Sequence, residues 1–119
     1  MTEIAKALYA FYSSFGIPAY TEDSVPSDAQ MPYITYTLPQ SEVFTGVTHQ
    51  VRVWYYGTSN APVNAKADEI LAAIGYGGVK LKAGRGFVCI YPGTPLAQMQ
   101  PADDTTRIVY INLGLRSYV

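Results

Sequence analysis

The residues best suited to nucleophilic chemistry are one histidine and one cysteine, His49 and Cys89. A Cys–His nucleophile needs the imidazole within hydrogen-bonding distance of the thiol, and a third group that orients the ring. His49 begins a segment that we interpret as a strand with a polar face. Cys89 lies in the apolar run 87–91, where a free cysteine is usually a small core residue. The two residues therefore do not predict a catalytic site.

Two other short motifs resemble chemical sites. Asp103 and Asp104 are adjacent carboxylates, but no histidine or second carboxylate cluster is spaced to complete a metal shell, so we interpret them as solvated turn residues. Arg85 lies between two glycines and between two expected strands, which favours a hairpin turn over a phosphate-binding loop. At the tip of that turn, Arg85 is a candidate contact with a partner. We expect no enzyme, no metal and no cofactor.

The composition indicates one small domain over residues 1–119. Hydrophobic residues make up 49% of the chain and charged residues 14%, which is typical of a globular protein. The net charge is -1 and the basic residues are scattered, so no stripe for nucleic acid is predicted. No apolar run approaches the roughly 20 residues that cross a bilayer. With one cysteine and no secretory signal, we expect a soluble protein made in a cytoplasm.

Two amphipathic segments predict helices that position the rest of the chain. In residues 2–15, apolar side chains recur at steps of three and four, and Gly16 follows as a candidate C-cap. A second apolar stripe begins after Asn60 and Pro62 and ends at Gly75.

The remaining regular patterns predict strands. The last strand is apolar on both faces, which is typical of a strand that is central or covered on both sides. We expect an α+β fold in which a mostly antiparallel, mixed sheet carries both helices on one face. The expected strands and one short extended segment are residues 17–20, 33–38, 48–56, 79–82, 87–91 and 107–116.

Eleven tyrosines against four phenylalanines and one tryptophan are a marked surplus. Tyrosine suits surfaces that are wet before assembly and buried after it, but it is also a good strand former, and both interpretations stay open. Residues 40–47 and 92–104 are long connections, and the first carries two apolar side chains, Val43 and Phe44, that would be unusual on the surface of a lone monomer. The residues expected at an interface are Val43, Phe44, Arg85, Leu96 and Met99.

Five short patterns follow one another in the first two-thirds of the chain. They are an amphipathic opening helix, Ile-Pro-Ala-Tyr at 17–20, Pro-Tyr-Ile-Thr-Tyr at 32–36, His-Gln-Val-Arg-Val-Trp-Tyr-Tyr at 49–56, and a Gly-Thr-Ser turn before a helix with Ala-Asp-Glu-Ile at 67–70. This succession resembles the small tail-terminator or tail-completion proteins of long-tailed bacteriophages and prophages. The last third of the chain fits that family in general shape only.

The resemblance implies a structural subunit of a homo-oligomeric ring, commonly hexameric, that caps the tail tube and docks on the head–tail connector. Such a ring lies in the tail or neck of the virion, is assembled in the cytoplasm of the bacterial host, and lets DNA pass its lumen without specific binding. The near-neutral charge is compatible with that passage. Ring closure needs two different patches on each subunit, which we assign to the two long connections, 40–47 and 92–104.

Two alternatives stay open. One is a neighbouring phage role, as a head–tail adaptor or a tail-tube component. The other is a small-molecule-binding domain or minor enzyme with a tyrosine-lined pocket between helix and sheet. A stable ring in a native mass measurement favours the assembly role, whereas a monomer that binds a metabolite tightly favours the second alternative.

Overall fold

A computed structural model describes residues 3–39, 46–101 and 104–118 of the chain. Within these residues, the strands form one sheet in the order β1-β2-β3-β6-β5-β4, in which β1 runs parallel to β2 and the other neighbours pair antiparallel. The α+β fold with a mixed, mostly antiparallel sheet is therefore confirmed. The elements are α1 (Glu3–Ser13), β1 (Ala19–Thr21), β2 (Tyr33–Tyr36), β3 (Val47–Tyr56), α2 (Ala61–Ile74), β4 (Val79–Ala83), β5 (Gly86–Pro101) and β6 (Thr106–Tyr118).

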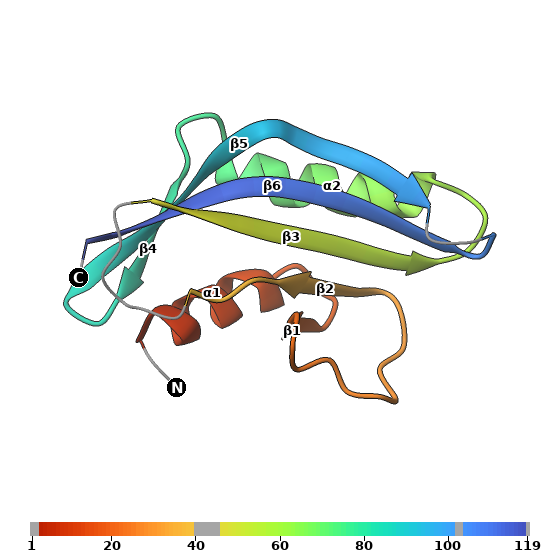
Figure 1. The fold of residues 1–119 in the computed structure, drawn as a ribbon, viewed down its shortest axis with the longest axis horizontal. Helices are drawn as coiled ribbons and strands as arrows, with labels where there is room; N and C mark the ends of the chain where they lie inside the picture. The colour runs from red at the N-terminus through yellow and green to blue at the C-terminus, as the bar shows by residue number, and fades with distance from the viewer. Residues whose placement is uncertain (1–2, 40–45, 102–103, 119) are drawn as a thin grey trace.

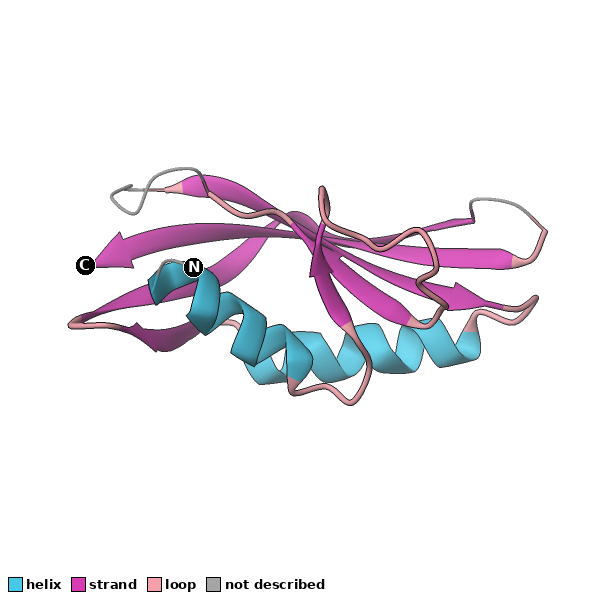
Figure 2. Ribbon diagram, turned by 90° about the horizontal axis from the view of Figure 1, so that it is seen from below, coloured by secondary structure: helices cyan, strands magenta, loops and turns pink. Residues whose placement is uncertain are grey.

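Both helices lie on the same face of the sheet, as Figure 2 shows. The helix α1 packs against β4 and β1, and α2 packs against β3, β6 and β5. No helix of the described part of the chain covers the opposite face, which we call the open face. Figure 1 looks onto the open face, with the strands in front of the helices.

Each helix turns one apolar stripe toward the sheet and ends near a glycine. The chain leaves α1 through Gly16, whose φ is +85°, and leaves α2 through Gly75, whose φ is +72°. The Gly75 N–H donates to the carbonyl of Leu71 at 2.8 Å, which satisfies one of the last free carbonyls of the helix. The buried residues of the two helices are Ile4, Ala5, Leu8, Tyr12, Val63, Ala67, Ile70 and Ile74.

The centre of the sheet is the antiparallel pair of β3 and β6. Val51 lies opposite Ile111 and Val53 opposite Val109, and all four side chains are buried under the helices. The expected central position of the last strand is confirmed.

The strand β5 corrects the sequence prediction most clearly. Residues 92–104 were expected to form a loop, but β5 continues to Pro101 and stays paired with β6. The register shifts between Pro92 and Ala97, so the strand absorbs its proline- and glycine-rich residues as a local irregularity. The prediction of a loop is therefore wrong over residues 92–101.

Two glycines lie at positions where a larger residue would not fit easily, one in the turn between β4 and β5 and one opposite Tyr91. Gly84 opens the two-residue turn between β4 and β5 with φ +61°, and Ala83 pairs with Gly86 across it, which confirms the expected hairpin. Gly114 on β6 lies opposite Tyr91 on β5, and a Cβ on Gly114 would overlap the Tyr91 ring. The Tyr91 ring therefore lies across β6, in the space that a side chain at position 114 would occupy.

The adjacent glycines Gly77 and Gly78 give a matched test of the turn before β4. Gly78 has φ +83°, and a Cβ there would lie 2.6 Å from the carbonyl oxygen of Ile90, whereas a Cβ on Gly77 meets nothing within 4 Å. We expect Gly78→Ala to lower the free energy of unfolding by about 1–3 kcal/mol in chemical denaturation. The control, Gly77→Ala, should stay within about 0.5 kcal/mol. Equal effects of the two substitutions would contradict this account.

Candidate functional site

His49 lies in the core, and its expected place on a polar face is wrong. It shares the helix-facing side of β3 with Val51 and Val53, and its side chain is 0% exposed. Its Nε2 lies 2.7 Å from the hydroxyl of Tyr12 on α1, and its Nδ1 lies 3.2 Å from Oγ1 of Thr37. The imidazole therefore links α1 to Thr37, the residue that follows β2.

The ionisation of this buried network is set by desolvation. Burial lowers the pKa of His49 from 6.5 to about 4, and a hydrogen bond to the Thr37 backbone opposes part of that shift. Burial also raises the pKa of Tyr12 well above its usual value, and Tyr36 adds to this effect. Tyr12 is therefore protonated and His49 neutral at pH 7. A Tyr12 O–H that donates to Nε2 leaves the ring proton of His49 on Nδ1, beside Thr37.

The structure does not bring the other chemically interesting residues together with His49. Cys89 lies between the buried Val88 and Ile90, on the opposite side of the sheet from His49, and is only partly buried. Asp104 is exposed in the turn before β6, and Asp103 lies outside the described residues. Within the described residues, no group of three or more His, Cys, Asp or Glu is placed to hold a metal ion.

The five residues expected at an interface lie in different environments or outside the described residues. Val43 and Phe44 lie outside the described residues. Arg85 is exposed at the tip of the β4–β5 turn. Leu96 and Met99 are partly buried on β5 and pack against the core, so much of their apolar surface is used within the subunit.

The open face carries a row of aromatic side chains across three strands. Tyr33 on β2 lies opposite Trp54 on β3, with ring centroids 5.8 Å apart, and Tyr20 on β1 packs edge-on against Tyr33 at the same separation. The indole N–H of Trp54 donates to Oγ1 of Thr35 at 3.0 Å, which fixes the ring. We call Tyr20, Tyr33 and Trp54 the aromatic row.

Arg52 joins this row to the centre of the open face. One guanidinium nitrogen lies 2.9 Å from a carboxylate oxygen of Glu22, and another donates to Oε1 of Gln50 at 3.1 Å. The guanidinium also lies over the ring of Tyr110, 5.0 Å from its centroid. These contacts hold a cation in a fixed orientation among aromatic rings, the composition that is enriched at protein interfaces.

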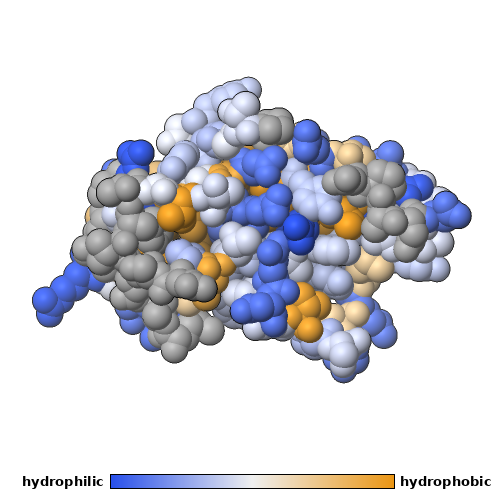
Figure 3. All heavy atoms as spheres, viewed as in Figure 1, coloured by the Kyte–Doolittle hydropathy of each residue, from blue (hydrophilic) through white to orange (hydrophobic). Residues whose placement is uncertain are grey.

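The open face as a whole is amphipathic. Figure 3 views it from the same side as Figure 1, and its hydrophobic colour forms separate patches among pale and blue atoms. The sequence predicts a strand with a polar face over residues 48–56, but its pattern does not identify Arg52, Trp54 and Tyr56 as a site. The missing signal was the pairing of strands, which places Tyr33 and Tyr110 beside them.

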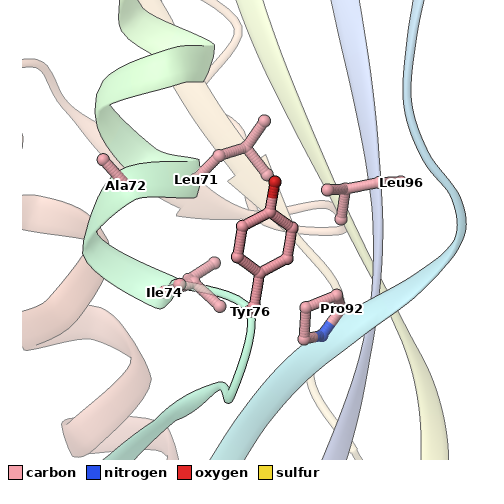
Figure 4. Close-up of a pocket in the computed structure, with 7 residues that line it drawn as sticks. Leu71, Ala72, Ile74, Tyr76, Pro92 and Leu96 are labelled. Atoms are coloured by element: carbon pink, nitrogen blue, oxygen red, sulfur yellow. The ribbon is translucent and has the colours of Figure 1, made fainter.

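A groove of about 440 Å³ lies on the other side of the sheet, between the end of α2 and β5. Figure 4 shows Tyr76 projecting between side chains of α2 and β5, and its 99% exposure places it at the mouth of the groove. The side chains and backbone that line the groove are mostly apolar and come from Leu71, Ala72, Ile74, Gly75, Tyr76, Pro92 and Leu96.

Comparison of the chain with protein-family models, with curated proteins and with solved structures gave no match. Neither helix of the described residues combines the length and the hydropathy that a membrane crossing requires.

The buried histidine predicts a loss of stability in acid. Because the pKa of His49 is about 4 in the folded chain and 6.5 as the ordinary value, the unfolded chain binds a proton first as the pH falls. The contribution of the neutral, buried His49 to the free energy of unfolding is complete above about pH 6.5, and it is lost as the pH falls toward 4. We expect the free energy of unfolding to drop by about 2 kcal/mol between about pH 7.5 and pH 5, measured by urea denaturation.

The control for this prediction is His49→Gln, which keeps polar atoms at the site but does not titrate. Its overall stability should be lower, because the hydrogen bond to Tyr12 is perturbed. Its loss of stability over the same pH range should be smaller than that of the wild type. An unchanged loss would assign the acid sensitivity to other groups.

Proposed function

We propose that this protein is a structural subunit that works by assembly, and that it caps the tail tube of a long-tailed bacteriophage as a tail-terminator protein. In this role identical subunits form a closed ring, hexameric in the family that the sequence resembles. The ring docks on the tube and on the head–tail connector, and DNA passes through it without specific binding. The place of action is the tail or neck of the virion.

The observation that carries the proposal is the open face. It presents Tyr20, Tyr33, Trp54 and Tyr110 around an oriented Arg52, and tyrosine, tryptophan and arginine are the side chains that most often dominate binding energy at interfaces. These side chains tolerate water before assembly because each carries a polar group.

The same surface is compatible with the neighbouring phage roles. A head–tail adaptor and a tail-tube component also work through subunit contacts and need no catalytic group. The three roles differ in what the ring binds, so the discriminating experiment mixes the purified protein with preformed tail tubes. A terminator binds one end of a tube and stops its growth, a tube component adds along its length, and an adaptor needs the connector.

A second candidate function is the binding of a small apolar molecule in the groove between α2 and β5. Its volume of about 440 Å³ lies within the range of ligand pockets, and Tyr76 offers a hydroxyl at the mouth. Native mass spectrometry of the purified protein should then detect a bound small molecule. The substitution Leu71→Glu should abolish that adduct, because it places a carboxylate in the apolar lining.

Assembly predicts that removing one ring from the aromatic row weakens the oligomer. We expect the wild type to form a closed oligomer in sedimentation velocity and native mass measurements. Tyr33→Ala should raise the dissociation constant of the subunits by at least about tenfold, because it deletes a half-buried aromatic contact.

The matched control is Tyr9→Ala. Tyr9 lies on α1, away from the open face, and is 50% exposed, so its loss should leave the oligomer unchanged. Thermal unfolding of both variants by circular dichroism separates assembly from folding. A wild type that stays monomeric at every concentration would refute the proposed function.

A further inference from the structure

The two edges of the sheet carry opposite charge. At one edge, β4 exposes Lys80 and Lys82 on alternate positions around Leu81, and Arg85 follows at the tip of the hairpin. None of these three cations forms an ion pair with another described residue. Glu3 lies against Gly84 at the base of the turn, but it pairs with Lys6 at 3.4 Å. We call Lys80, Lys82 and Arg85 the basic edge.

Aromatic rings accompany the basic edge. Lys80 and Lys82 face Cys89 and Phe87 across the β4–β5 ladder, and Phe87 is 46% exposed. The ammonium of Lys80 lies 6.0 Å from the centroid of the Phe87 ring. This end of the open face therefore offers cations beside accessible apolar surface.

The opposite edge of the sheet carries acidic side chains, in the connection from β1 to β2. We call Glu22, Asp23 and Asp28 the acidic edge. Residues 22–32 contain Glu22, Asp23 and Asp28 and no lysine, arginine or histidine. Glu22 pairs with Arg52, while Asp23 and Asp28 are exposed and form no ion pair with another described residue. In Figure 1 this connection and the β4–β5 hairpin lie far apart, because β1 and β4 are the outermost strands.

We infer that the basic edge of one copy docks on the acidic edge of the next copy, and that this contact orders the subunits head to tail. The inference rests on the proposed function, since it names the contact that closes the ring, and it takes the place of the assignment of that contact to residues 40–47 and 92–104. The charges are complementary, and each group of charges borders aromatic surface, Phe87 on one side and the aromatic row on the other. A contact between two different patches is the heterologous kind that ring closure requires.

The lysines on β4 also keep an edge strand from pairing with other strands, so the test must separate that role from docking. Glutamate on β4 also places a charge on the edge strand, which opposes edge pairing, but it reverses the sign of that charge. The hairpin variant is Lys80→Glu with Lys82→Glu, and the loop variant is Asp23→Lys with Asp28→Lys. The combined variant carries all four substitutions and has the net charge of the wild type.

We expect each two-residue variant to raise the dissociation constant of the oligomer by about 100-fold or more, because like charges then face each other. The combined variant should restore the oligomer, since its charges are again complementary. High salt, at about 0.5 M, should weaken the wild-type oligomer for the same reason. Sedimentation velocity and native mass on the full chain report all of these changes, and circular dichroism reports folding.

Three results would overturn the inference. If the wild type forms rings and both two-residue variants keep them, the edges do not dock and the proposed function stands. If the two-residue variants dissociate and the combined variant is not restored, the edges contact something other than each other. If the wild type is monomeric at every concentration, the proposed function fails and this contact fails with it.

Discussion

The pairing of β3 with β6 holds the structure together, because it decides which side chains face the helices. Side chains alternate along a strand, so Val51 and Val53 enter the core while Arg52 and Trp54 leave it. A slip of one residue in this register would exchange the two sets and bury a guanidinium under α2. The core, the open face and the position of His49 all depend on this single alignment.

The sequence predicts the elements whose patterns repeat over several turns or pairs. Both helices and the central strands were found because their apolar residues recur regularly, and glycines mark the ends. The long course of β5 was not found, since Gly93 and its neighbouring prolines are typical of a loop. Only the pairing with β6, which continues beyond Ala97, identifies these residues as part of a strand.

His49 illustrates a different limit of sequence reasoning. The alternation of β3 places it on the same side as Val51, but a histidine suggests a polar environment. The partner that makes its burial possible is Tyr12, which lies 37 residues earlier on α1. No local pattern in the sequence predicts a hydrogen bond across that separation. The residue type alone therefore led to the wrong expectation of a polar environment for His49.

The tyrosine surplus has two physical explanations, and the fold uses both. Tyr12 and Tyr36 are stacked in the core with ring centroids 4.9 Å apart. Tyr20, Tyr33 and Tyr110 extend over the open face instead. Composition alone does not show which tyrosines lie in the core and which lie on the open face, whereas strand pairing and helix packing do. The candidate surface therefore emerges only when the register is known.

The contact between Tyr91 and Gly114 constrains how this chain can change over time. A side chain at position 114 would overlap the Tyr91 ring, so that ring must either move aside or be replaced by a smaller residue. A change at position 91 has no such requirement, because a smaller residue there leaves space and creates no overlap. A route that changes position 91 before position 114 therefore avoids the displacement of the ring that the opposite order requires.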